Sequence, residues 1–283
     1  MMKCFRIIAR GAVTLLIALS SCQNKESEKG KDPLEESYKL IDRGSYSEAI
    51  DLLIGLEKND KRSQVRVALG SAYAARAGIK VDQYWGFVVG FKAPLMKVKA
   101  ESVPATGKLE SLQRIVQQAN GKIDTQQMQA LSELSQTIRV WDQYKDRVDA
   151  IPVVQGEALK DVHRAINVLA LVKTPGGRLY RAILNLILFK TYVTASQDFW
   201  TRFNGSMEEA INGSLTSLCK VEFPDLLGWL NPISYHLMET LTDLTVAFPE
   251  SEKDFVEARN LIQEVYSTAK SAVGELNSKR MCP

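Results

Sequence analysis

The sequence contains few of the residues from which metal, redox and catalytic sites are usually built. Its 283 residues include two histidines and four cysteines. No His-Glu-x-x-His or Cys-x-x-Cys spacing occurs, and a P-loop, a dinucleotide-binding glycine pattern and a Gly-x-Ser-x-Gly nucleophile elbow are also missing. The sequence therefore predicts no metal site, no cofactor and no catalytic residue, and we expect the protein not to be an enzyme.

The two histidines also lack the neighbours that a catalytic base needs. His163 and His236 both lie in stretches with helical periodicity. Asp161 is two positions before His163, and residues at that spacing point to different faces of a helix. Both histidines are therefore expected to be partly buried packing residues.

Excess positive charge is confined to the amino-terminal end. The chain has 36 lysines and arginines against 33 aspartates and glutamates, and three of the cations, Lys3, Arg6 and Arg10, precede Cys22 with no acidic residue among them. Without this leader the basic count falls to 33 and equals the acidic count. A nucleic-acid-binding protein carries a basic footprint, so the sequence predicts no nucleic-acid partner.

The leader has the organisation of an export signal. Its charged first ten residues are followed by an apolar stretch at 11–19, which is shorter than the roughly 20 residues that span a bilayer. The stretch ends in Leu19-Ser20-Ser21-Cys22, which resembles the lipobox of bacterial lipoproteins. The resemblance implies that residues 1–21 are a signal peptide and that Cys22 then carries acyl chains such as palmitate. An ordinary secretory signal and an uncleaved anchor are the alternatives.

Lipidation at Cys22 implies a stable membrane anchor, because one acyl chain binds a bilayer only marginally and two or more hold a protein there. Gln23 follows the cysteine where aspartate would favour the inner membrane in enteric-type sorting. We therefore expect the protein at the bacterial envelope, anchored to the outer membrane and facing the periplasm. Residues 22–33 are polar and mixed in charge, which predicts a flexible tether.

Two cysteines remain in the body of the protein, Cys219 and Cys282. In an oxidising periplasm they can form a disulfide that pins the carboxyl-terminal residues to the body. A buried free Cys219 with an exposed thiol at Cys282 explains the sequence equally well, since sequence alone does not give their distance. Both interpretations stay open.

Helical periodicity runs through the body, and strand-like alternation is hard to find. A first helix is predicted at 34–44, with Gly44 as its stop. Ser45-Tyr46-Ser47-Glu48 has the spacing of a capping box that opens a second helix. A third helix is predicted at 65–78.

These three helices resemble tetratricopeptide repeats. Residues 44–50 (GSYSEAI) are similar to the turn between the two helices of a repeat, and residues 69–73 (LGSAY) to the middle of the next first helix. Gly78 follows Gly44 by 34 residues, which is the repeat period. The resemblance covers roughly residues 33–80, with Gly70 among the small residues that allow close helix packing. Lys80 departs from the pattern, which usually has an aromatic residue there.

The stretch at 82–98 is apolar and rich in aromatic residues, and residues 100–106 read as a linker. The aromatic stretch is interpreted first as a core helix that closes the array. Its alternative is a ligand pocket or partner-docking surface. The residues of that surface are Tyr84, Trp85, Phe87 and Phe91.

The remainder, residues 106–283, is predicted to be an irregular helical bundle. Amphipathic helices are expected at 124–151 and at 157–172, the second stopped by Pro175-Gly176-Gly177. The run at 179–189 is apolar on nearly all sides and is expected to be a surrounded, central helix. Further helices are expected at about 206–219, at 225–247 and along a carboxyl-terminal apolar seam. The predicted fold is all-α, with tetratricopeptide-like hairpins at 34–100 followed by this bundle.

Two classes of function fit these features. The first is a lipid-anchored helical scaffold that binds a protein partner at the bacterial envelope, as the resemblance to tetratricopeptide-type lipoproteins implies. The second is a ligand-binding accessory lipoprotein of a periplasmic solute transport system, with the aromatic stretch lining its cavity. A closed apolar pocket favours the ligand, whereas an open groove favours the partner.

Overall fold

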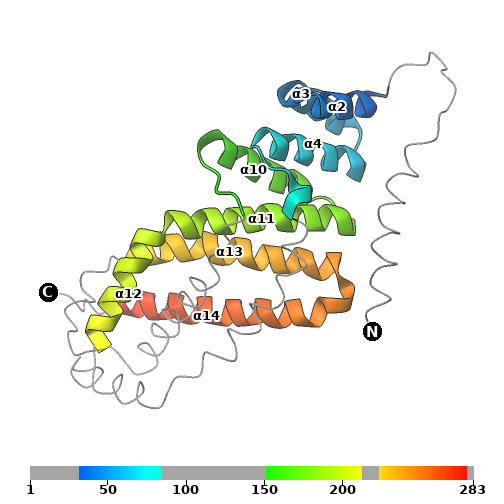
Figure 1. Ribbon diagram of the computed structural model, residues 1–283. Coiled ribbons are helices and arrows are strands. Elements are labelled where there is room, and N and C mark those ends of the chain that lie inside the picture. Colours follow the sequence, from blue (N-terminus) through cyan, green and yellow to red (C-terminus); the bar gives the residue numbers. More distant parts are fainter. Residues whose placement is uncertain (1–31, 85–150, 212–222, 279–283) are drawn as a thin grey trace, which may run out of the picture.

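The computed structural model describes residues 32–84, 151–211 and 223–278, which include no strand and form eight α-helices, so that the predicted all-α fold class is confirmed (Figure 1). The predicted leader, nearly all of the tether, the linker at 100–106 and all but the last residue of the helix predicted at 124–151 lie outside these residues. The helices are α2 (Pro33–Asp42), α3 (Tyr46–Asn59), α4 (Ser63–Arg76), α10 (Gly156–Leu169), α11 (Pro175–Ala195), α12 (Gln197–Ile211), α13 (Phe223–Ala247) and α14 (Glu252–Ser278), with short 3₁₀ turns η1 (Val81–Tyr84) and η3 (Pro249–Ser251).

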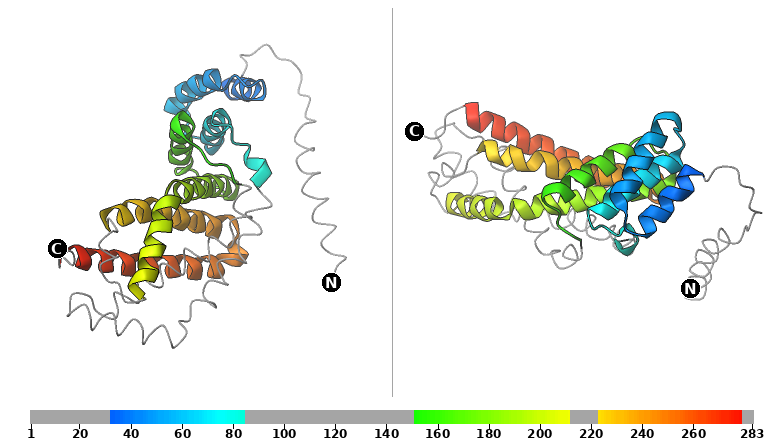
Figure 2. Two further views of the ribbon diagram at one scale, coloured as in Figure 1. Left: turned by 60° about the vertical axis from the view of Figure 1, so that its left-hand side comes forward. Right: turned by 90° about the horizontal axis from the view of Figure 1, so that it is seen from above.

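Seven of these helices form one stack in chain order. Each packs mainly against the next, from α2 through α3, α4, α10, α11 and α13 to α14. Figure 2 shows the α2–α3 hairpin at one end of the stack and α14 at the other. α12 continues from the end of α11 and makes fewer contacts with the stack. None of the helices described is long and apolar enough to cross a membrane.

The ends of α2 and α4 have the same geometry, 34 residues apart. Gly44 and Gly78 both adopt φ of 80°, a left-handed conformation that favours glycine. The amide after each glycine donates to the carbonyl five residues earlier, at 2.9 Å in both turns. The amide of each glycine donates to the carbonyl three residues earlier, at 3.0 and 2.9 Å. This pair of bonds is a Schellman motif, and it ends both helices as the sequence predicts at Gly44.

α4, the helix that precedes the turn at Gly78, packs against a helix far along the chain. α4 packs on α3 and also, closely, on α10. A Cβ atom added to Gly70 would lie 2.8 Å from Cγ of Leu169, so glycine permits the two helices to approach. The close packing expected at Gly70 is therefore found, and the helix that approaches is α10.

A single apolar core runs through the stack, from Leu34 in α2 to Phe255 in α14. It draws on both segments that the sequence separates at the linker. α11 lies in its middle, and every residue from Arg181 to Thr191 is buried, as expected for a surrounded helix. The run includes charged and amide side chains as well as apolar ones, and these define the site described below.

Three local expectations are corrected by the structure. α3 begins after Ser45 as predicted, but the Ser45 side chain forms no capping hydrogen bond. Pro175-Gly176-Gly177 does not stop the preceding helix, which already ends at Leu169. These residues form the first turn of α11, where the Thr174 hydroxyl accepts a hydrogen bond from the Gly177 amide at 3.3 Å. The helix expected at about 206–219 begins earlier, at Gln197, and the structure describes it to Ile211.

Candidate functional site

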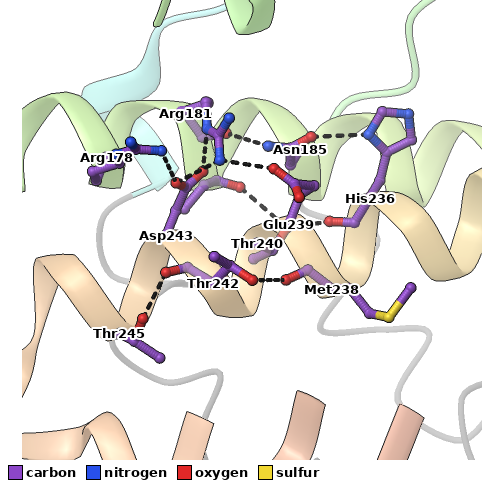
Figure 3. A network of polar contacts seen from close by, with 11 residues as sticks. Arg178, Arg181, Asn185, His236, Met238, Glu239, Thr240, Thr242, Asp243 and Thr245 are labelled. Atoms are coloured by element: carbon purple, nitrogen blue, oxygen red, sulfur yellow. Dashed lines mark hydrogen bonds and ion pairs between the residues drawn. The ribbon is translucent and has the colours of Figure 1, made fainter. Parts of the chain in front are cut away.

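Four charged side chains meet between the two central helices. Arg178 and Arg181 are three positions apart on α11, and Glu239 and Asp243 are four positions apart on α13. Either spacing places two side chains on one face of a helix. The two faces oppose each other in the stack, and we call these four residues the ion-pair network (Figure 3).

Asp243 is the centre of the ion-pair network. Its side chain is fully buried, and it accepts two hydrogen bonds from Arg181, from Nε at 2.6 Å and from Nη2 at 2.8 Å. Arg178 Nη1 donates a third bond to Asp243 at 3.1 Å. Arg181 Nη2 also donates to the Glu239 carboxylate at 2.8 Å, and the Glu239 side chain is partly exposed. Two guanidinium groups thus balance two carboxylates inside the protein.

The electrostatics of the ion-pair network favour a structural role. Burial of the Arg181 guanidinium opposes its charge, but its hydrogen bonds with Asp243 and the charges of Asp243 and Glu239 outweigh that effect and raise the pKa of Arg181 above its usual value. Among the described residues, only Arg178 Nε is a buried side-chain nitrogen or oxygen without a hydrogen-bond partner. The carboxylate of Asp243 is held by three hydrogen bonds from the two arginines.

One turn further along α11, Asn185 links the helix to His236 of α13. The Asn185 Nδ2 atom donates to the carbonyl of Arg181 at 3.2 Å, and a carbonyl only accepts. The amide oxygen therefore faces His236, whose Nδ1 lies 2.9 Å away. It follows that His236 carries its proton on Nδ1 and donates to Asn185.

Aromatic rings surround His236 on its other sides. The Tyr192 ring stacks on it with centroids 5.6 Å apart, and the Tyr235 ring meets it edge-on at 5.0 Å. His163 of α10 lies 5.8 Å away between ring centroids, and its Nε2 is 3.3 Å from the Tyr192 hydroxyl. We call these four residues and Asn185 the histidine cluster, which joins α10, α11 and α13.

Burial dominates the titration of both histidines. It lowers the pKa of His163 below its usual value. It also lowers the pKa of His236 to about 4, with a further contribution from the charge of His163. Partly buried packing histidines are predicted from the sequence. His236 is only 4% exposed, and its contact with His163 was not anticipated.

A second ionic contact closes the α4–α10 packing. Arg76 of α4 donates to both carboxylate oxygens of Asp161, each at 2.7 Å, and Arg164 donates to the same group at 2.8 Å. Hydrogen bonds from Arg76 lower the pKa of Asp161 against the effect of burial, and those from Arg164 add to the decrease. As predicted from their spacing, Asp161 and His163 serve different faces of α10.

Of the site residues predicted from the sequence, the structure describes Tyr84. It ends η1 and packs, partly buried, against the apolar core. The remaining residues of the predicted aromatic surface, the lipidation site Cys22 and the cysteine pair lie outside the described residues: Trp85, Phe87, Phe91, Cys22, Cys219 and Cys282.

Within the ranges 32–84, 151–211 and 223–278, no group of three or more histidine, cysteine, aspartate or glutamate side chains is arranged to hold a metal ion. Comparison with protein families, with curated proteins and with solved structures finds no match. The residues of this chain and their geometry therefore carry the functional argument.

The ion-pair network and the histidine cluster were not found by sequence reasoning. The signal was present in part, because Arg178 and Arg181 share a spacing that complements Glu239 and Asp243. Asn185 also interrupts an otherwise apolar run. These spacings place side chains on one face of a helix but do not say which helix that face meets.

Proposed function

We propose that this protein is a lipid-anchored, periplasm-facing helical scaffold that binds a protein partner at the bacterial envelope. The anchor rests on the resemblance of Leu19-Ser20-Ser21-Cys22 to a lipobox. The partner-binding role rests on the helix array at the amino-terminal end of the stack. Membrane attachment by acyl chains would leave that array free to face a partner.

The observation that carries the scaffold proposal is the pair of matching helix ends at Gly44 and Gly78. They have equal φ values and the same hydrogen bonds, 34 residues apart. In arrays of helical repeats, each unit packs on its neighbours and the stacked helices present an extended binding surface. The stacking of α2, α3, α4 and α10 supports the same use here.

The first hairpin also carries exposed apolar side chains. Tyr38 on α2 is 43% exposed, and Ile54 on α3 is 39% exposed. Large apolar side chains at the open end of a repeat array are typical contacts for a partner, because their burial drives association. We therefore place the proposed binding surface on the α2–α3 hairpin.

A photo-crosslinking amino acid at position 54 tests this placement. In intact cells it should give a discrete crosslinked product with one protein. The matched control is the same amino acid at position 246, because Val246 is 40% exposed and lies at the far end of α13. Substitution Tyr38→Glu should abolish the product at position 54.

The scaffold proposal fails if positions 54 and 246 give the same products, or if position 54 gives none at any crosslinker dose. The anchor is tested separately by incorporation of radiolabelled fatty acid. Label should enter the wild-type chain and not the Cys22→Ala variant. Label that persists in the variant would contradict lipidation at Cys22.

A further inference from the structure

The two histidines of the chain lie side by side between packed helices. Neither belongs to the ion-pair network. His163 belongs to α10 and His236 to α13, yet the two rings are 5.8 Å apart between centroids. Histidine is the side chain whose charge ordinarily changes between pH 5 and 8. A pair of them in contact between helices can therefore couple packing to pH.

Among the described residues, those that contact His236 include no carboxylate that could balance the positive charge of a second proton. From α11, the amide oxygen of Asn185 already accepts the Nδ1 proton, so another proton must go to Nε2. Tyr192 stacks on the ring from α11, and Tyr235 meets it from α13. From α10 comes His163, whose own charge would repel it.

The nearest acidic groups on α13 are already committed. Glu239 and Asp243 are bound to Arg181 and Arg178 in the ion-pair network. A cation on His236 would thus be buried without a counter-charge, which is among the costlier changes inside a protein.

We propose that the histidine cluster is an acid-sensitive joint, at which protonation of His236 loosens the packing of α13 against α10 and α11. The joint is independent of the proposed scaffold function. It requires only that the chain meet a medium of falling pH.

The direction of the effect follows from linkage. The pKa of His236 is lowered to about 4 in the folded protein, whereas an unfolded histidine titrates near 6.5. The unfolded state therefore binds more protons between these values, so stability is full above pH 6.5 and falls as the pH drops toward 4. From pH 7.5 to pH 5, the unfolding equilibrium constant should rise about 30-fold through His236 alone.

The experiment is urea unfolding of the full chain at pH 7.5 and pH 5, for wild type, His236→Gln and His163→Gln. Because the chain has only two histidines, pH dependence in this range reports mainly on them. We expect a change of at least about 30-fold in wild type, most of it retained in His163→Gln, and a clearly smaller change in His236→Gln, where only His163 contributes. A change of equal size in wild type and His236→Gln would overturn the proposal, and so would its loss in His163→Gln alone.

Two measurements on the wild-type chain keep the test decisive if His236→Gln does not fold. With labelled histidine, one of the two imidazole NMR signals should show no titration down to about pH 5; two signals that both titrate near 6.5 contradict the proposal. Hydrogen exchange should show protection lost from α13 at pH 5 while α3 keeps it. Equal loss in both helices would mean that acid weakens the whole fold and that there is no joint.

Discussion

The stack has two principal helix interfaces, α4–α10 and α11–α13, which we also call joints. They are formed by different kinds of side chain. Between α4 and α10, glycine lets the backbones approach, with Gly70 against Leu169. The ionic contact through Asp161 is made by arginines that are partly exposed. The Asp161 carboxylate is buried as well. Between α11 and α13, by contrast, both partners of an ion pair are buried, Arg181 and Asp243.

The difference shows two ways of fixing the register of packed helices. A glycine facing a leucine works by shape, because a shift along the axis would bring a larger side chain into the close contact. The ion-pair network works by polarity, because a shift would leave Asp243 or Arg181 buried without its partner. The ion-pair network therefore imposes a larger free-energy penalty on a shifted register, although the contact itself adds less to the free energy of unfolding.

The largest expected effect is at Asp243. Substitution Asp243→Ala leaves two arginines at the buried joint without their shared carboxylate, and we expect a loss of about 3–5 kcal/mol in the free energy of unfolding, measured with urea. Glu239→Ala is the control, since Glu239 is partly exposed and binds Arg181 only once. It should cost about 1 kcal/mol.

The same joint can be rebuilt without charge. Combining Asp243→Leu with Arg178→Leu and Arg181→Met should recover most of the loss seen in Asp243→Ala, because an apolar replacement of a buried ion pair is often neutral or stabilising. If Asp243→Ala were as stable as wild type, the contrast between the two joints would disappear.

At the α4–α10 joint, the informative change is Gly70→Ala. Alanine normally stabilises a helix by up to about 1 kcal/mol relative to glycine, but the added Cβ would press on Leu169, and overpacking costs about 1–3 kcal/mol. We expect a net loss of about 1 kcal/mol in thermal or urea unfolding. Gly55→Ala in α3 is the matched control, because nothing lies within 4 Å of its added Cβ, and it should be stabilising.

A double variant tests whether the cost comes from the contact. Leu169→Ala in the Gly70→Ala background should cost less than Leu169→Ala alone, since the new methyl group fills part of the space. Strict additivity of the two changes would show that the close approach of α4 and α10 is not what makes Gly70 necessary.

Losses about as small as that of Gly70→Ala are expected at the two helix ends. Gly44→Ala and Gly78→Ala each place a side chain in the left-handed region, which costs about 1 kcal/mol. Neither added Cβ meets another atom within 4 Å, so the backbone term alone should appear, and it should be equal at the two positions. Unequal losses of stability on urea unfolding would weaken the equivalence of the two turns.

Helix ends and buried helices could be predicted from the sequence, because they depend on local residue chemistry. Gly44 ends α2 as predicted, because a left-handed glycine is needed there whatever packs nearby. The apolar run at 179–189 is central as predicted, because its hydrophobicity leaves no face for water. Pro175 was misread as a stop, since proline suits both the break after one helix and the first turn of the next.

Pairing between helices was the part that sequence patterns did not provide. That α4 packs on α10, and that Asn185 meets His236, depends on contacts between residues far apart in the chain. Asp243 illustrates the problem, because an aspartate within a helix usually points to solvent. Only its position opposite two arginines explains why it is buried.

The contact between Arg76 and Asp161 spans 85 positions of the chain. α4 is therefore synthesised well before the helix that covers its glycine face. During that interval Gly70 lacks its native contact with Leu169. Closing a loop of this length adds little free energy beyond that of a shorter one, but long-range contacts slow folding. The stack is thus completed by a contact between parts of the chain that lie far apart in sequence.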